Sequence, residues 1–208
     1  MKIIVFGANG AVGSEIVKQA LELGYIVTAF VRSAEKLGAL HHKNLRIELG
    51  DAAQKEDVEK AINGHDAVLC ALGDGRKGII RTTGTRNIIV AMEQLHVQRF
   101  ICQTTLGMGD SYHNLNAFWK YFMFGFFLKR AFEDHKQQEQ LIANTNLAYT
   151  LVRPSALTDG GITNQFKRGF GADQKKLTLK ISKADVASFM LAQLQSKQYI
   201  QKSVSISN

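Results

Sequence analysis

Residues 2–17, KIIVFGANGAVGSEIV, decide the fold of this chain. They predict a short buried strand, a glycine-rich turn and the first turns of a helix. In such a turn Gly7 permits a tight exit from the strand, Gly10 leaves room for a pyrophosphate near the backbone, and Gly13 lets the helix pack closely. The free N–H groups and the dipole at the helix start favour the phosphate charge.

The glycine spacing is G-x-x-G-x-x-G, and such a triplet is weak support by itself. A preceding strand, a following helix and a second strand at residues 25–31 supply the context that a dinucleotide site needs. The alternative is an ordinary strand-to-helix turn. We interpret the turn as the first part of a cofactor site, with these candidate residues: Gly7, Asn9, Gly10, Ala11, Val12 and Gly13.

The second strand is followed by Arg32 and Ser33, with Lys36 one turn later. NAD sites usually place an Asp or Glu here for the ribose hydroxyls, whereas NADP sites use Arg for the 2′-phosphate. Because Arg32 is a planar, permanent cation, we expect NADP(H) to be favoured over NAD(H) and these three residues to bind it. The alternative is that Arg32 is a solvated loop cation.

Strands and helices alternate along the rest of the chain, which is typical of βαβ units and a parallel sheet. We expect an α/β fold, a Rossmann-type doubly wound parallel sheet with helices on both faces and a small C-terminal appendage. It would form one domain over residues 1–208, with substrate-side elements in about 104–131 and 154–208. Helices are expected at about 11–23, 34–40, 54–63, 79–95, 129–144 and 182–195, and strands at 25–31, 45–49, 66–72, 99–103, 147–152, 176–181 and 203–207.

Five candidate residues fall at the ends of strands of this predicted sheet: Gly7, Arg32, Asp51, Gly73 and Thr104. Ligands of open α/β sheets bind beyond the carboxyl ends of the strands. This shared location supports a ligand site more strongly than any single motif does.

Composition narrows the class of protein. The chain has 208 residues, is 45% hydrophobic and carries a net charge of +8, which suits an anionic ligand. It has no basic block or nucleic-acid motif, so we expect no nucleic-acid partner. No apolar run is long enough for a transmembrane segment. Cys70 and Cys102 lie in apolar runs, which favours core thiols and a cytoplasmic location.

Residues 117–128, AFWKYFMFGFFL, form the most unusual stretch, with the single tryptophan and five of the 12 phenylalanines. Three interpretations stay open. It is a helix or lid over the sheet, the wall of a pocket for a flat aromatic substrate, or a contact with a membrane surface or a second copy.

Together these residues resemble the atypical short-chain dehydrogenase/reductases, especially the NmrA-like and biliverdin reductase B/flavin reductase-like group. The resemblance covers most of the chain. Besides the glycine turn and Arg32, it rests on Gly50-Asp51, Ala71-Leu72-Gly73, Thr104-Thr105-Leu106-Gly107, Asp134-His135 and residues 149–159, YTLVRPSALTD. The last segment is the more specific, since the glycine turn is common to a very large superfamily.

The resemblance implies a role for each segment. Asp51 and Ala52 would lie by the adenine, and residues 71–73 would pass along the ribose. Thr104 and Thr105 would lie near the nicotinamide, and residues 154–157 would flank its carboxamide. Beyond the glycine turn and the Arg32 loop, the expected cofactor-binding residues are Asp51, Ala52, Ala71, Leu72, Gly73, Thr104, Arg153, Pro154, Ser155, Ala156 and Leu157.

One departure from the wider family concerns its chemistry. Ordinary short-chain dehydrogenases use Tyr-x-x-x-Lys as acid and base, and none of the five tyrosines has a lysine four residues later. Phe132 and Lys136 keep the spacing without a hydroxyl. The chain therefore argues against alcohol–ketone chemistry and sugar-nucleotide epimerisation.

Hydride transfer to a flavin or a linear tetrapyrrole needs no strong acid on the protein, because the acceptor is electrophilic and solvent can supply the proton. We therefore expect an NADPH-dependent reductase of a small planar acceptor. Thr104 or Thr105 would hydrogen-bond the nicotinamide or substrate, and His135 would orient the substrate or relay a proton. The alternative for His135 is an exposed helix histidine. The other histidines lack ligand spacing, so no metal is expected.

The competing function is not catalytic. NmrA-like proteins bind the dinucleotide and act as redox sensors through a protein partner, and the missing tyrosine suits that role equally well. Turnover separates the two, since a sensor binds NADP and NADPH but reduces nothing. The sequence leaves the oligomeric state, monomer or dimer, open.

Overall fold

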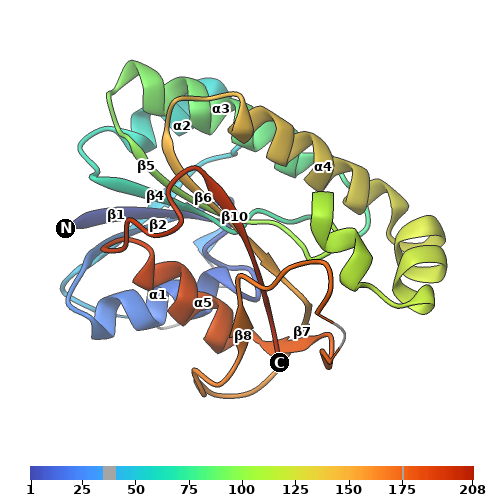
Figure 1. The fold of residues 1–208 in the computed structure, drawn as a ribbon. Coiled ribbons are helices and arrows are strands. Elements are labelled where there is room, and N and C mark those ends of the chain that lie inside the picture. The colour runs from blue at the N-terminus through green and yellow to red at the C-terminus, as the bar shows by residue number, and fades with distance from the viewer. Residues whose placement is uncertain (35–40, 175) are drawn as a thin grey trace.

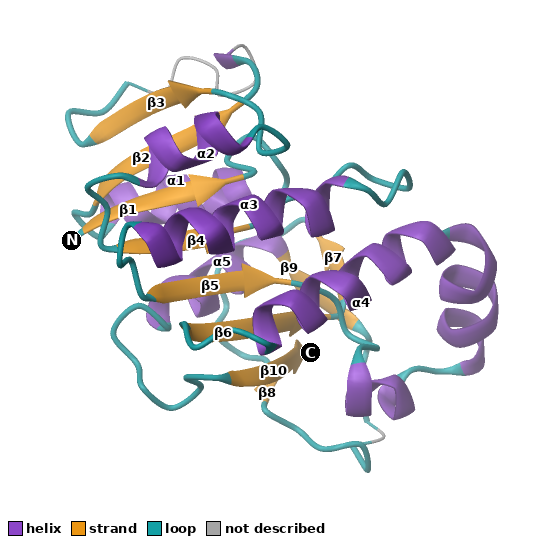
Figure 2. Cartoon of the chain, turned by 90° about the horizontal axis from the view of Figure 1, so that it is seen from above, coloured by secondary structure: helices purple, strands orange, loops and turns teal. Residues whose placement is uncertain are grey.

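The computed structural model describes residues 1–34, 41–174 and 176–208. Within these residues the centre is an eight-stranded sheet of order β3-β2-β1-β4-β5-β6-β10-β8 (Figures 1 and 2). All neighbours pair in parallel except β8, which is antiparallel to β10 at one edge. The strands are Lys2–Phe6 (β1), Ile26–Val31 (β2), Leu45–Leu49 (β3), Ala67–Cys70 (β4), Arg99–Gln103 (β5), Ala148–Pro154 (β6), Lys167–Arg168 (β8) and Lys202–Ser207 (β10).

The strand order reverses at β1 and β4, which lie side by side although β1 is followed in the chain by β2. Phe6, the last residue of β1, is in register with Phe30 of β2 and with Cys70 of β4. The loops that leave β1 and β4 therefore emerge next to each other. In doubly wound sheets this reversal is where ligands bind.

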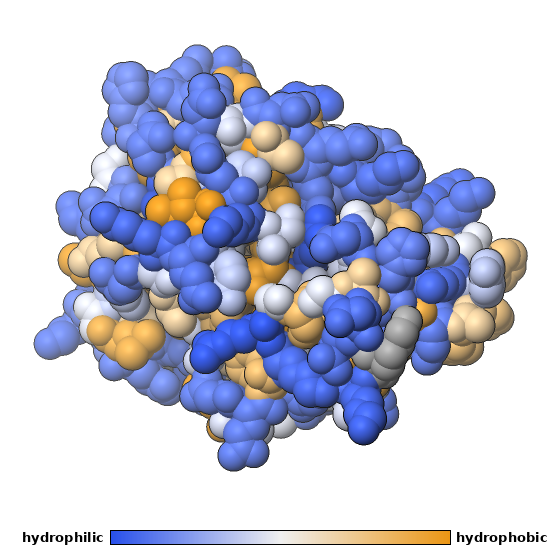
Figure 3. All heavy atoms as spheres, viewed as in Figure 1, coloured by the Kyte–Doolittle hydropathy of each residue, from blue (hydrophilic) through white to orange (hydrophobic). Residues whose placement is uncertain are grey.

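Helices cover both faces of the sheet (Figure 1). On β1, alternate residues point to opposite faces, so Ile3 and Val5 join one apolar cluster while Ile4 and Phe6 join the other. Hydrophilic residues cover most of the face in Figure 3, with smaller apolar patches between them. The expected fold class is confirmed. One face carries Gly13–Glu22 (α1) and Lys183–Ala192 (α5), and the other carries Lys55–Ile62 (α2), Ile80–Gln94 (α3) and Lys129–Ala143 (α4).

Most predicted elements are present, with their ends moved by one to a few residues. The predicted helix at 34–40 lies outside the described residues, apart from its first. The predicted strand at 176–181 is wrong over its first part, since Lys180–Ser182 (β9) begins later and pairs with Ala156–Thr158 (β7). Thr178 instead uses its backbone N–H to donate to the Asn208 carbonyl.

The C-terminal segment is joined to the sheet more closely than an appendage would be. Strand β10 pairs in parallel with β6, and α5 packs on the same face as α1. Ser182 caps α5 as its sequence predicts, because its hydroxyl accepts the Asp185 N–H at 2.9 Å. Within the described part of the chain, no helix has the length and apolar character needed to cross a membrane.

Residues 118–127 form a π-helix, Phe118–Phe127, which we call the aromatic helix. Helices of this kind are rare and are usually a single turn long. A short 3₁₀ helix, Gly109–Asn114, precedes it, and α4 follows it. The aromatic helix lies beyond the carboxyl ends of the strands and does not cover the sheet (Figure 2).

Candidate functional site

The glycine turn brings the end of β1 against the loop after β4. Gly7 has φ +78°, and a Cβ there would collide with the Ala71 carbonyl. Gly10 donates its backbone N–H to the Gly7 carbonyl at 2.8 Å. A Cβ on Gly13 would collide with that same carbonyl, so α1 packs directly on the turn. Only residues without side chains fit this geometry.

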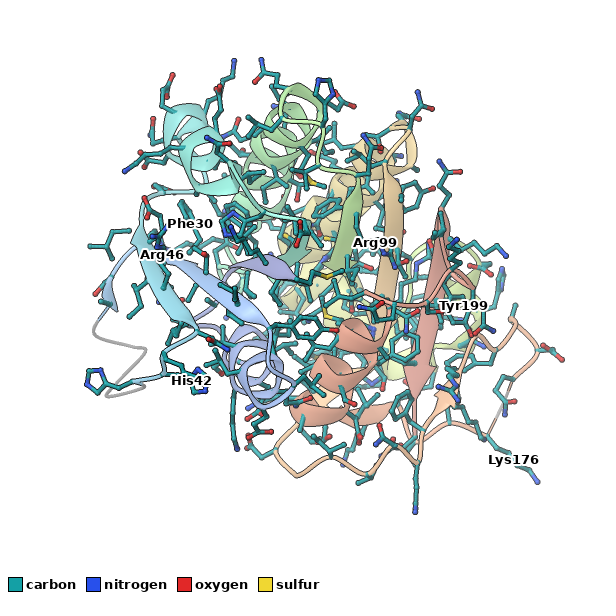
Figure 4. All side chains as sticks on the ribbon, turned by 90° about the vertical axis from the view of Figure 1, so that its left-hand side faces the viewer. Phe30, His42, Arg46, Arg99, Lys176 and Tyr199 are labelled. Atoms are coloured by element: carbon teal, nitrogen blue, oxygen red, sulfur yellow. The ribbon has the colours of Figure 1, made fainter. Side chains whose placement is uncertain are left out.

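A groove with a volume of about 390 Å³ runs from this turn across the carboxyl ends of β1, β2 and β4. Phe30, on β2, lines it and packs on Phe6 with ring centroids 4.7 Å apart (Figure 4). Arg32 lies in its wall as an exposed cation. The groove brings together twelve of the predicted cofactor residues: Gly7, Asn9, Gly10, Ala11, Val12, Arg32, Asp51, Ala52, Ala71, Leu72, Gly73 and Leu157.

A second cavity of about 410 Å³, which we call the apolar chamber, adjoins the groove. Trp119, Phe124 and Leu128, at the aromatic helix and its end, form one wall. Seven predicted site residues line the chamber: Thr104, Thr105, His135, Pro154, Ser155, Ala156 and Leu157. Four residues line both spaces: Arg81, Gln103, His135 and Leu157.

Three predicted cofactor residues line neither space. Gly13 lies behind the turn, Ser33 lies beyond the groove, and Arg153 is buried on β6. Arg153 instead forms a forked ion pair with Glu139, with Nε–Oε1 at 2.9 Å and Nη2–Oε2 at 2.6 Å. Lys36 lies outside the described residues.

Thr104 belongs to the same buried network. Its hydroxyl donates to Glu139 Oε1 at 2.6 Å, and the residue is 1% exposed. Burial lowers the pKa of Arg153, but its hydrogen bonds and charge contacts with Glu139 raise it overall, so the guanidinium stays charged. Glu139 thus ties the end of β5 to the end of β6 beneath the chamber.

Sequence reasoning missed Arg81, which lies where the two cavities meet. Its Nη1 donates to Asp74 Oδ1 at 3.0 Å and lies 3.5 Å from Asp134 Oδ2, while its buried Nε has no partner among the described residues. An arginine in the first turn of a helix opposes the helix dipole. That mismatch is the signal that could have found it.

Two carboxylates hold the start of α3 and so fix Arg81. Asp74 accepts N–H groups from Gly78, Ile79 and Ile80, and Asp134 accepts those of Arg81 and Thr82. Burial raises the pKa of Asp74, but these N–H donors and Arg81 lower it overall, so it is ionised. The α3 N-terminus is therefore occupied by the protein's own acids.

His135 of α4 lines both cavities. Burial, together with the charge of Arg81, lowers its pKa to about 3, so the ring is neutral over the physiological range. Its Nδ1 lies 3.2 Å from Gln138 Oε1, and Gln138 Nε2 donates to Thr85 at 2.9 Å. That arrangement assigns the proton to Nδ1 and leaves Nε2 as an acceptor.

Ser155 contributes a second uncharged polar group to the apolar chamber. The residue is 6% exposed, and its hydroxyl has no hydrogen-bond partner among the described residues. Buried hydroxyls are rarely left unpaired in folded proteins. This hydroxyl is therefore available to a molecule in the chamber.

The residues of the groove fit a dinucleotide. The turn offers backbone without side chains next to the first turn of α1, which suits a pyrophosphate. Arg32 and the unpartnered Arg81 Nε add positive charge and a buried donor. Asp51 is fixed by its own turn, because its Oδ1 accepts the Ala53 N–H at 3.0 Å.

Comparison with known proteins supports this description. A family model described as NAD(P)H-binding matches residues 7–197. Protein TIC 62, chloroplastic, from Pisum sativum is 33% identical over 183 residues, which cover 74% of this chain and 32% of that protein. The chain thus spans about a third of the length of the TIC 62 proteins it matches.

Two solved structures share the fold. ChuY, an anaerobilin reductase from Escherichia coli O157:H7, has a TM-score of 0.83 at 24% identity, covering 99% of this chain and 96% of that one. A short-chain dehydrogenase/reductase from Veillonella parvula in complex with NADP has a TM-score of 0.84 at 14% identity, covering 100% and 94%. These two structures show that the chain shares their fold, and the family model over residues 7–197 confirms the NAD(P)H-binding family that the sequence indicated.

Proposed function

The chain belongs to the NAD(P)H-binding family, and on that premise we propose that it is an NADPH-dependent reductase of a small planar conjugated acceptor. The observation that carries the proposal is the junction of the groove with the apolar chamber, where both share Arg81, Gln103, His135 and Leu157. A dinucleotide in the groove and a flat acceptor in the chamber would meet there, in the geometry that hydride transfer requires.

The groove residues would hold the cofactor, which supplies the hydride when it is bound. The glycine turn and the start of α1 would bind the pyrophosphate. Asp51 and Ala52 would lie by the adenine, and residues 71–73 would lie along the ribose. Arg32 would bind a 2′-phosphate, and this supports NADPH over NADH.

The uncharged polar groups of the chamber would orient the reacting rings. The Ser155 hydroxyl can donate or accept, and neutral His135 can accept at Nε2, so they suit a carboxamide or a ring N–H. Thr105 would add a hydroxyl. The Thr104 hydroxyl is held by Glu139, so in this proposal Thr104 and Arg153 position the chamber wall.

A conjugated acceptor is the substrate class that the chamber suits best. Trp119, Phe124 and Leu128 offer flat apolar surface. All five tyrosines are among the described residues, and none lines either cavity. A reaction whose proton comes from solvent needs no tyrosine, and the solved relative named as an anaerobilin reductase supports a reductase.

The first test is the loss of nicotinamide absorbance on mixing the purified chain with NADPH and FMN, with NADH measured in parallel. We expect loss that depends on FMN and is faster with NADPH. A quinone and a linear tetrapyrrole are tested as further acceptors. NADPH binding without turnover of any acceptor would overturn the reductase proposal.

A matched pair of variants locates the reaction in the chamber. Leu128→Trp fills the chamber with a large ring, whereas Leu23→Trp places the same ring on an exposed position elsewhere. We expect the first variant to lose turnover by about tenfold or more while still binding NADPH. Equal turnover in the two variants would place the acceptor elsewhere.

The second candidate is an NADP-sensing regulator that acts through a protein partner. The exposed outer face of the aromatic helix favours it, because a sensor needs a contact surface near its cofactor. Such a protein would bind NADPH and leave every acceptor unreduced. The buried thiols Cys70 and Cys102 suit a reducing compartment, and we propose the cytoplasm for either function.

A further inference from the structure

The outer face of the aromatic helix exposes large aromatic side chains. Tyr121 and Phe126 are 74% and 77% exposed, and Phe118 and Phe122 are each more than half exposed. Phe118 and Phe122 stack on each other with ring centroids 5.4 Å apart. Surface aromatics gathered in this way are unusual in a monomer and mark an interaction site.

The opposite face of the same helix is already used by the protein. Phe124 stacks on Phe132 of α4 with centroids 4.4 Å apart, and Trp119 packs against Phe124 at 5.5 Å. The outer rings therefore cannot turn inward without losing these contacts. The helix projects at the edge of the molecule, away from the sheet (Figure 2), and apolar colouring appears at the corresponding edge of Figure 3.

Four exposed cations border these rings, and they come from two segments that meet. Arg76 lies over the Phe127 ring at 3.8 Å and donates to the Phe127 carbonyl at 3.3 Å. Gly78 approaches the Arg130 backbone so closely that a Cβ would collide with it. A shallow hollow is lined by Arg76, Lys77, Phe126, Phe127, Lys129 and Arg130.

The two segments that carry these rings and cations contain few acidic side chains. Residues 75–92 and 111–132 contain no Asp or Glu. Of the flanking acids, Asp74 is paired with Arg81 at 3.0 Å, Asp110 is paired with Arg153 at 2.9 Å, and Glu133 is exposed one turn into α4. The surface is therefore both aromatic and positively charged.

We propose that the outer face of the aromatic helix docks onto an anionic lipid bilayer. Aromatic rings enter the headgroup region, and the lysines and arginines beside them attract anionic headgroups. A second copy of this chain fits less well as the partner. A contact with two-fold symmetry would place the four cations of one copy close to the same four cations of the other, and like charges repel. Docking would use only the outer rings and would leave Trp119 and Phe124 in the chamber wall. The docking proposal therefore holds whether or not the chamber carries out the proposed reaction.

The test is co-sedimentation of the purified chain with vesicles. One set contains phosphatidylcholine alone and the other contains phosphatidylcholine with phosphatidylglycerol, each over a series of salt concentrations. We expect binding to the anionic vesicles that weakens as salt rises, and about tenfold weaker binding to the neutral ones. Absence of binding to anionic vesicles overturns the proposal.

Two pairs of variants assign the binding to this surface. The triple variant Phe118→Ser/Phe122→Ser/Phe126→Ser should lower partitioning by about tenfold or more, while the control Leu23→Ser/Leu49→Ser, at exposed apolar positions elsewhere, should not. Arg76→Gln/Lys77→Gln/Lys129→Gln/Arg130→Gln should remove the salt dependence. Its control neutralises four exposed lysines elsewhere: Lys18, Lys43, Lys55 and Lys197.

Circular dichroism checks that each variant is folded, and the single tryptophan provides a second readout. Trp119 belongs to the aromatic helix, so brominated lipid should quench its fluorescence when the wild type binds and not when the triple variant is mixed with vesicles. Equal binding by the triple variant and its control overturns the proposal. The proposal is also overturned if the wild type is a dimer without lipid and the triple variant is a monomer, because the aromatic face then binds a second copy of the chain.

Discussion

At the scale of single residues, His135 makes stability depend on pH. Its pKa in the folded chain is about 3, below the usual 6.5, so the unfolded chain takes up the proton more readily. Stability is therefore lost as the pH falls below 6.5. Between roughly pH 7 and pH 5 the wild type should lose about 2 kcal/mol more free energy of unfolding than His135→Gln does.

Urea titrations of both proteins at each pH measure this difference. Burial also lowers the pKa of His65, but this contribution is the same in both proteins and cancels from the difference between their free energies of unfolding. His113→Gln, which replaces an exposed histidine, should follow the wild type. Parallel curves for the wild type and His135→Gln would show that the ring is not held neutral by burial.

Arg32 carries the cofactor preference at the same scale. Arg32→Ala should weaken NADPH binding by about tenfold or more and leave NADH binding unchanged, because a charge-assisted contact to the 2′-phosphate is lost. Arg46→Ala, which removes an exposed arginine of β3 (Figure 4), is the control. Calorimetric titration measures both affinities, and an equal loss for the two cofactors would contradict the assignment.

The contrast between Arg32 and Arg81 shows what a sequence reveals about single residues. Arg32 follows a strand at a fixed distance from the glycine turn, so its place in the groove could be predicted. Arg81 has its place set by Asp134, which lies 53 residues away on another helix. Neither spacing nor composition encodes such a contact, and the same holds for the burial of Thr104 and Arg153 against Glu139.

At the scale of elements, Asp185 joins the start of α5 to the loop between β7 and β8. Its carboxylate accepts the N–H groups of Thr163 and Asn164, each at 2.8 Å, and the Thr163 hydroxyl at 2.8 Å. Burial raises its pKa, but these bonds lower it overall, so it is ionised at neutral pH. Asp185→Ala should lower the free energy of unfolding by about 2–4 kcal/mol.

Asp159→Ala provides the comparison for that prediction. Asp159 is 95% exposed and pairs with Lys183 at 2.6 Å, so its loss should change the free energy of unfolding far less than the loss of Asp185 does. Urea unfolding at neutral pH measures both variants. Similar losses for the two would mean that the Asp185 hydrogen bonds contribute little to α5.

Elements with strong local signals could be predicted, and those defined by long-range pairing could not. The capping box at residues 182–185 predicted the start of α5, and the apolar run at residues 66–72 predicted β4. Strand β8 has two residues and exists because it pairs with β10. The aromatic helix was identified as unusual from composition, but its π-helical form and its two different faces depend on packing against Phe132, which no local pattern specifies.

At the scale of the whole molecule, one sheet separates two apolar clusters. The alternation of strands and helices along the chain was enough to predict helices on both faces, and alternate residues of β1 are indeed buried in the two clusters. The junction of groove and chamber could not be predicted in the same way. It arises where α3, α4 and the aromatic helix converge beyond the strand ends, and their positions depend on the whole fold.

The sheet should also make the two clusters unfold together. Ile16 of α1 and Ile88 of α3 are both 0% exposed and lie in opposite clusters. Each Ile→Ala variant should lose about 2–4 kcal/mol in a single transition, because neither cluster keeps its strands when the other is lost. The double variant should lose the sum to within about 0.5 kcal/mol, since the sheet separates the two sites.

Urea unfolding followed by far-ultraviolet circular dichroism measures these losses, with Leu23→Ala, at an exposed position, as the control. Trp119 fluorescence, which reports on the apolar chamber, should change at or before the same midpoint, because that region has its own small cluster outside the sheet. If either variant split the circular dichroism transition into two steps, the faces would be separate folding units. In that case the groove, which depends on the ends of strands common to both faces, would lose its structure when only one face unfolds.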